Sequence, residues 1–158
     1  MKKAKGKKKK IAIVIIILAL ILLTVIIFAH NNIHNSRNKI REEISSYVTT
    51  NDTKLTEFSI QYLNHETKEK KFDDVEVDGI YGDKHKIVQF YYSGEGIAPA
   101  SIYYGFYYSP DDVPSDFDGM GYDLSKVSDN EWEWSAEGDD GGYTKKIMDG
   151  WYYYEAWY

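Results

Sequence analysis

The chain has 158 residues and no cysteine, and its net charge of −6 combines two opposed parts. Seven lysines lie within residues 1–10, whereas residues 11–158 contain twelve Lys and Arg against twenty-five Asp and Glu, a net charge of −13. The lack of cysteine excludes disulfides, thiol chemistry and a lipid anchor on cysteine, and the acidity of the larger part argues against nucleic acid as a partner and favours cations or basic proteins.

Residues 11–29 form an apolar run that predicts a single membrane-spanning helix. The run contains only Ile, Leu, Val, Ala, one Phe and one Thr, and a helix of this length covers about 28 Å, close to the roughly 30 Å hydrocarbon core of a bilayer. The basic tail, residues 1–10, is expected to stay in the cytoplasm, which places the rest of a single-pass protein outside a bacterial cell membrane. The alternative is cleavage after Ala29, although no A-x-A site precedes that position.

The polar segment that follows, residues 30–52, is predicted to hold a juxtamembrane helix and linker. Its apolar residues recur on one helix face, and they are Ile33, Ile40, Ile44, Tyr47 and Val48. The stretch 49–53 is expected to end this helix, with Asp52 or Thr53 as the N-cap of a second short helix. That second helix would carry Leu55, Phe58, Tyr62 and Leu63. Residues 58–62 also alternate in polarity, so a strand there is the alternative.

Beyond the polar linker 65–71 the apolar period changes to two, which is typical of strands. We predict strands over residues 75–78, 87–92, 101–109, 131–134, 143–148 and 151–158. Gly82-Asp83 and Asp149-Gly150 are turn signals, whereas the segment from Gly94 to Pro99 is expected to be a loop. Residues 53–158 are therefore predicted to form one extracytoplasmic α+β domain, with one or two short helices and a small antiparallel sheet in meander order.

The acidic segment 110–121 contains the pattern D-x-D-G, which occurs in the middle of calcium-binding loops. In that register the first and last ligand positions are Pro114 and Ser125 instead of Asp and Glu. Two interpretations are therefore possible for this segment. One is a weak calcium site formed by Asp116, Asp118 and Asp123, and the other is an acidic turn in contact with solvent. We favour the solvated turn and assign no metal or cofactor.

The second half of the chain is rich in aromatic residues, since residues 90–158 hold twelve Tyr, all four Trp and three Phe. In the last predicted strand Trp151, Tyr153 and Trp157 share one face with Glu155, while the intervening tyrosines share the other. Because both faces of so small a sheet cannot readily be core, we expect some of these rings to be half-exposed.

Such a Tyr/Trp surface beside carboxylates could stack on sugar rings or receive the side chains of a partner. The candidate binding residues are Trp151, Tyr153, Glu155, Trp157, Trp132 and Trp134. The simpler interpretation is that Tyr and Trp are good strand formers, which cover one face packed by helices and one face in contact with water.

The sequence contains no nucleophile-elbow, zinc-protease, P-loop or dinucleotide-binding motif. We therefore favour a membrane-anchored, non-catalytic binding module whose partner, besides the bilayer, is an envelope glycan or another protein. One alternative is an envelope hydrolase that uses a carboxylate pair. The other alternative is an accessory or immunity partner of another membrane protein.

Overall fold

The computed structural model describes residues 2–97 and 100–158, except for the side chains of residues 2–14, 29–30 and 32–34. The chain divides into two compact units, Met1–Lys39 and Ile40–Tyr158, which are described separately. The fold is α+β, with one long helix followed by an eight-stranded antiparallel sheet.

The described residues of the first unit are helical and belong to α1, which runs from Lys2 to Leu63. Twelve large apolar side chains between residues 15 and 28 are each at least 50% exposed. Within the described part of the chain, no helix combines the length and hydropathy that a membrane crossing requires. Of the predicted span 11–29, residues 11–14 and 29 have side chains that lie outside the description.

The second unit begins with the remainder of α1, which continues without interruption through residues 49–53. The predicted helix break is therefore wrong, as is the alternative strand over 58–62. Polar side chains of this stretch bond within the helix, since Thr49 donates to the carbonyl of Ser45 at 2.9 Å and Asn51 to that of Tyr47 at 2.9 Å. The expected N-cap residue Asp52 accepts from the Thr56 hydroxyl at 3.4 Å instead. The buried positions Ile44, Val48 and Leu55 stay on one face across the stretch, so packing against the sheet favours one continuous helix.

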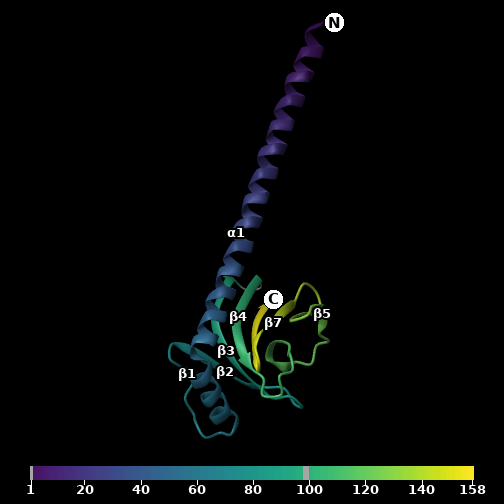
Figure 1. The fold of residues 1–158 in the computed structure, drawn as a ribbon. Helices are drawn as coiled ribbons and strands as arrows, with labels where there is room; N and C mark the ends of the chain where they lie inside the picture. Colours follow the sequence, from purple (N-terminus) through teal and green to yellow (C-terminus); the bar gives the residue numbers. More distant parts are fainter. Residues whose placement is uncertain (1, 98–99) are drawn as a thin grey trace. The chain divides into compact units, whose positions relative to one another are not determined.

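The sheet contains eight strands in the spatial order β1-β2-β3-β4-β8-β7-β6-β5, each antiparallel to its neighbours (Figure 1). The strands are β1 Lys71–Phe72, β2 Val75–Tyr81, β3 Ile87–Ile97, β4 Ala100–Tyr108, β5 Ser125–Ser128, β6 Glu131–Ser135, β7 Gly141–Met148 and β8 Trp151–Trp157. All six predicted strands are present, and the Asp149-Gly150 turn joins β7 to β8. The short strands β1 and β5 were not predicted, and Gly94–Ile97, expected as a loop, extends β3.

The predicted meander is interrupted once, because β4 pairs with β8 and not with β5. The segment between β4 and β5, residues 109–124, crosses to the edge of the sheet opposite β1, where β5 lies. From there β6, β7 and β8 follow in order back towards β4. The last strand is consequently internal to the sheet, paired on one side through Tyr107↔Tyr152 and on the other through Thr144↔Tyr154.

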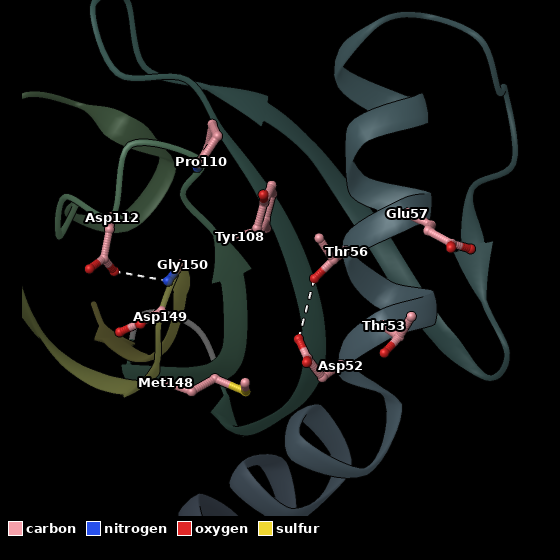
Figure 2. Close-up of a pocket in the computed structure, with 10 residues that line it drawn as sticks. All are labelled: Asp52, Thr53, Thr56, Glu57, Tyr108, Pro110, Asp112, Met148, Asp149 and Gly150. Atoms are coloured by element: carbon pink, nitrogen blue, oxygen red, sulfur yellow. Dashed lines mark hydrogen bonds between the residues drawn. The ribbon is translucent and has the colours of Figure 1, made fainter.

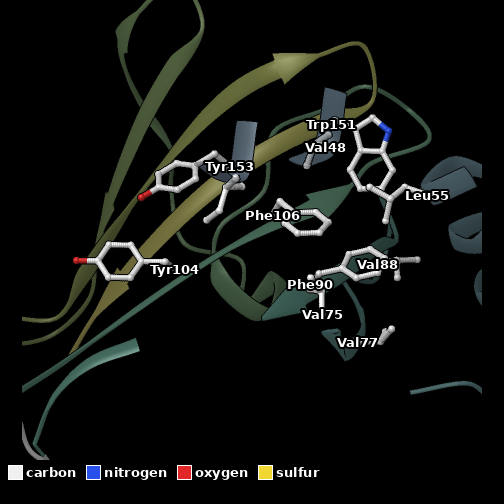
Figure 3. Close-up of a cluster of buried hydrophobic side chains, with 11 residues drawn as sticks. Val48, Leu55, Val75, Val77, Val88, Phe90, Tyr104, Phe106, Trp151 and Tyr153 are labelled. Atoms are coloured by element: carbon white, nitrogen blue, oxygen red, sulfur yellow. The ribbon is translucent and has the colours of Figure 1, made fainter. Parts of the chain in front are cut away.

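One face of the sheet packs against residues 40–63 of α1 (Figure 3). Phe106 lies at the centre of this core, stacked on Phe90 with ring centroids 4.8 Å apart and 5.9 Å from Trp151. The buried members are Ile44, Val48, Leu55, Val75, Val77, Val88, Phe90, Tyr104, Phe106, Trp151 and Tyr153.

The opposite face is covered by the 109–124 segment, which includes the short 3-10 helix η1, Phe117–Gly119. Phe117 packs 5.3 Å from Tyr154, and Tyr107 stacks on Tyr152 at 5.1 Å. The buried members of this second core are Ile87, Tyr107, Tyr152 and Tyr154. Both faces of β8 are therefore core, contrary to the expectation from sequence, because the strand is internal and the 109–124 segment forms a second cover.

Candidate functional site

A groove of about 540 Å³ lies between α1 and the turn that joins β7 to β8 (Figure 2). One wall is formed by helix residues and the other by the start of the 109–124 segment and by the turn, with Tyr108 between them. The described lining residues are Asp52, Thr53, Thr56, Glu57, Tyr108, Pro110, Asp112, Met148, Asp149 and Gly150. Four of these ten are acidic and none is basic.

The helix wall is held to the sheet by Trp151, directly after the turn. The Trp151 indole N–H donates to the Thr56 hydroxyl at 3.1 Å, and its ring lies 5.1 Å from that of Tyr108. Trp151 is fully buried, so it supports the groove from below without reaching its surface. Two groove residues, Thr56 and Tyr108, therefore have their positions fixed by the core.

The turn wall is organised by Asp112, which has a left-handed backbone with φ of +54°. Its carboxylate accepts hydrogen bonds from the Gly150 N–H at 2.8 Å, from the Tyr152 hydroxyl at 3.1 Å and from the Lys146 ammonium. Burial opposes the ionisation of Asp112, but these three donors outweigh it and lower the pKa of the carboxyl. Asp112 is thus a fixed anion at neutral pH.

Lys146 partly neutralises the turn wall, because it pairs with Asp112 and lies 2.9 Å from the carboxylate of Asp149. On the helix wall, Asp52 accepts only a long hydrogen bond from Thr56 at 3.4 Å. Among the described residues neither Asp52 nor Glu57 forms an ion pair. Lys146 therefore balances only part of the negative charge of the groove. The groove can attract a cation by its charge and can pack against the apolar part of that cation through Tyr108 and Met148.

The predicted binding residues on β8 do not form an exposed surface. Trp151 and Tyr153 are fully buried, and Glu155 is 3% exposed. The Glu155 carboxylate accepts from the Arg41 guanidinium at 2.7 Å and from the Tyr153 hydroxyl at 2.9 Å. Arg41 also lies over the rings of Tyr143 and Tyr153, so this cluster attaches α1 to the sheet.

The structure does not bring the other predicted tryptophans into one site, and only two of these three are partly exposed. Trp157 and Trp132 are half-buried, and Trp132 lies 6.2 Å from Tyr152 on the face covered by the 109–124 segment. Trp134 is 3% exposed and stacks on Tyr122. The six candidates are thus divided between the two faces of the sheet.

The carboxylates of the weak calcium candidate hold the 109–124 segment in place. Asp116 is 5% exposed and accepts from the Tyr122 N–H at 2.7 Å, whereas Asp118 accepts from the Gln89 amide at 2.7 Å. The described residues contain no group of three or more His, Asp or Glu side chains placed to hold a metal ion. The solvated turn expected here is wrong, because Asp116 is buried and η1 packs on the sheet.

Sequence reasoning missed the groove, because its walls lie far apart in the chain. Asp52 and Glu57 lie five residues apart on α1, whereas Asp112 and Asp149 belong to a loop and a turn. The Asp149-Gly150 turn signal was the one local indication.

Comparison of the chain with models of protein families, with curated proteins and with solved structures finds no match.

Proposed function

We propose that this chain is a membrane-anchored, non-catalytic binding module whose acidic groove receives a basic segment of another protein. The observation that supports the binding function is the charge of the groove, whose described lining contains four carboxylates and no basic residue. A lysine or arginine side chain suits this lining, since its alkyl stem packs on Tyr108 and Met148 while its charged end meets the carboxylates.

Anchoring through residues 11–29 is supported by the exposed apolar side chains of residues 15–28. Consecutive large apolar residues surround the helix on every side, and a helix of that kind requires a cover of lipid or protein. The hydroxyl of Thr24 donates to the carbonyl of Ile21 at 2.7 Å, which satisfies the polar group within the helix. With the lysines of residues 1–10 in the cytoplasm, residues 40–158 lie outside the membrane.

The anchor is tested by extraction of cell membranes at high pH. The full chain should stay in the membrane fraction, and Leu20→Arg together with Leu22→Arg should release it, because each arginine at a helix centre opposes insertion by about 2.5–3.5 kcal/mol. Release of the unchanged chain, or retention of the double variant, would contradict anchoring through this segment.

The groove is tested with the full chain in nanodiscs of neutral lipid, by calorimetric titration with tetralysine and with tetraglutamate. Tetralysine should bind, with an affinity that falls as salt rises, and tetraglutamate should not. Asp52→Asn with Glu57→Gln should weaken tetralysine binding at least tenfold. The control, Asp83→Asn with Glu95→Gln, removes two exposed charges elsewhere and should change it little.

Equal weakening in the two double variants would mean that tetralysine responds to the net charge alone and would overturn the groove as the site. Absence of tetralysine binding to the unchanged chain would overturn the proposal as well. Circular dichroism of each variant establishes that the fold is kept; Asp52→Asn retains an acceptor for Thr56, so no unfolding is expected.

A further inference from the structure

A second hollow, of about 490 Å³, lies at the opposite edge of the sheet from β1, where β5 separates from β6. The last paired residues of the two strands at this end are Ser125 and Glu133. Its described lining residues are Gly121, Tyr122, Asp123, Ser125, Glu133, Trp134 and Ser135. The groove described above shares none of these residues.

The aromatic part of this hollow is rigidly built. The rings of Tyr122 and Trp134 are parallel within 2° and 4.9 Å apart. Gly142, paired with Trp134, leaves the room that the indole occupies, since a Cβ there would come within 2.3 Å of the ring. The Tyr122 N–H is fixed by Asp116, so the phenol ring is presented as a flat wall at small cost in side-chain entropy.

The polar part consists of side chains that have no other role in the described structure. Asp123 and Glu133 are exposed carboxylates, Ser125 and Ser135 are exposed hydroxyls, and none of the four makes a side-chain hydrogen bond or an ion pair among the described residues. The hollow therefore offers carboxylate acceptors and hydroxyl groups beside an aromatic ring.

We propose that this hollow at the β5–β6 edge binds a neutral saccharide unit. The C–H face of a sugar ring is apolar and packs on an aromatic ring, whereas its hydroxyls donate to carboxylates and exchange hydrogen bonds with serine. The volume lies within the range of small-molecule sites. Two carboxylates without a basic neighbour in the lining, in a domain of strong negative charge, disfavour uronic acids and phosphorylated glycans.

The test uses the full chain in lipid nanodiscs, because alkyl glycoside detergents carry saccharide headgroups that would compete. Calorimetric titrations compare a tetramer of N-acetylglucosamine, its cationic deacetylated form and a tetramer of galacturonic acid. The neutral tetramer should bind with an affinity that changes less than twofold between 50 and 500 mM salt, and the acidic tetramer should not bind.

Asp123→Ala with Glu133→Ala should weaken binding of the neutral tetramer at least tenfold. The control, Glu137→Ala with Asp139→Ala, removes two exposed carboxylates that do not line the hollow, and it should leave the affinity within twofold. Tyr122→Ala should abolish binding, and its far-ultraviolet circular dichroism separates loss of the wall from loss of the fold.

Binding of the cationic tetramer alone, abolished by salt, would overturn the proposal in favour of an ammonium site. It is also overturned if no tetramer binds at millimolar concentration, or if the control weakens binding as much as Asp123→Ala with Glu133→Ala. Tetralysine binding in the groove is measured separately, so either proposal can fail without the other.

Discussion

On one face of the sheet a regular helix covers the core, and on the other face an irregular acidic segment does. The helix face has Phe90, Phe106 and Trp151 at its centre, and it also buries Tyr104 and Tyr153. On the face under the 109–124 segment, the rings of Tyr107 and Tyr152 are buried while their hydroxyls bond to the segment, whereas the Tyr154 hydroxyl donates to the Phe90 carbonyl in β3. Tyr152 donates to the carbonyl of Asp112 at 2.8 Å, and Tyr107 accepts from the Ser115 N–H at 2.8 Å.

The difference follows from the backbone of each cover. A helix satisfies its own N–H and C=O groups and needs only an apolar stripe to cover a sheet. An irregular segment leaves those groups unpaired, so burial requires donors and acceptors from the sheet beneath it. Tyrosine supplies both the apolar ring and the polar end, so Tyr107 and Tyr152 satisfy groups of the segment while their rings stay in the core. On the helix face the buried Tyr153 hydroxyl bonds to Glu155 of the sheet instead.

The largest expected effect is on the helix face. Trp151→Ala removes the indole from the fully buried core together with its hydrogen bond to Thr56, and it should lower the free energy of unfolding by about 3–5 kcal/mol. The measurement is urea unfolding of the full chain, with Ile97→Ala, at a side chain 87% exposed, as the control. A decrease in the free energy of unfolding of less than about 1 kcal/mol would contradict the conclusion that Trp151 is central to the stability of the core.

An intermediate effect is expected on the other face. Tyr107→Phe keeps the ring but leaves the Ser115 N–H without its acceptor and removes one of the two hydrogen bonds of the Thr144 hydroxyl, which should cost about 1–3 kcal/mol. Tyr91→Phe is the matched control, because the Tyr91 hydroxyl makes no hydrogen bond among the described residues.

Hydrogen exchange sharpens the contrast between the faces. Tyr107→Phe should speed exchange in residues 109–124 more than in β3 and β4, whereas Trp151→Ala should speed exchange throughout Ile40–Tyr158. Uniform acceleration by Tyr107→Phe would mean that the segment and the helix open together.

The smallest effect concerns the charge of Asp118 and depends on pH. Burial, together with the nearby carboxylates Asp78 and Asp116, raises the pKa of Asp118 despite its hydrogen bond from Gln89. A raised pKa in the folded state gives stability at low pH that is lost as pH rises through that pKa. Asp118→Asn keeps an acceptor for Gln89 and suits the left-handed backbone, φ +58°.

The variant should therefore be more stable than the unchanged chain at pH 7, by less than about 1 kcal/mol. The difference should shrink as the pH falls through the raised pKa of Asp118, because the carboxyl then loses its charge. Thermal unfolding from pH 3 to pH 7 measures this difference in stability between the variant and the unchanged chain. Asp139→Asn is the control for the removal of an exposed charge. A stabilisation that does not change with pH would contradict the assigned cause.

The sequence by itself determined the local elements. Alternation placed the six longer strands and assigned Trp151, Tyr153, Glu155 and Trp157 to one face of β8, and Asp149-Gly150 marked the hairpin turn. These features follow from the period of the backbone, which short stretches of sequence contain. The break predicted at 49–53 failed because packing across the stretch outweighs the low helix propensity of its threonines.

Only the tertiary structure decided which strand is internal, what covers the second face and where the groove lies. Pairing of β4 with β8 joins residues that are 43 to 55 positions apart, from Tyr108↔Trp151 to Ile102↔Trp157, and no local pattern specifies that choice. The same pairing buries both faces of β8 and turns the acidic 109–124 segment from a solvated loop into a cover. It also brings Asp112 and Asp149 opposite Asp52 and Glu57, since charges distant in the chain become neighbours only when the sheet is complete.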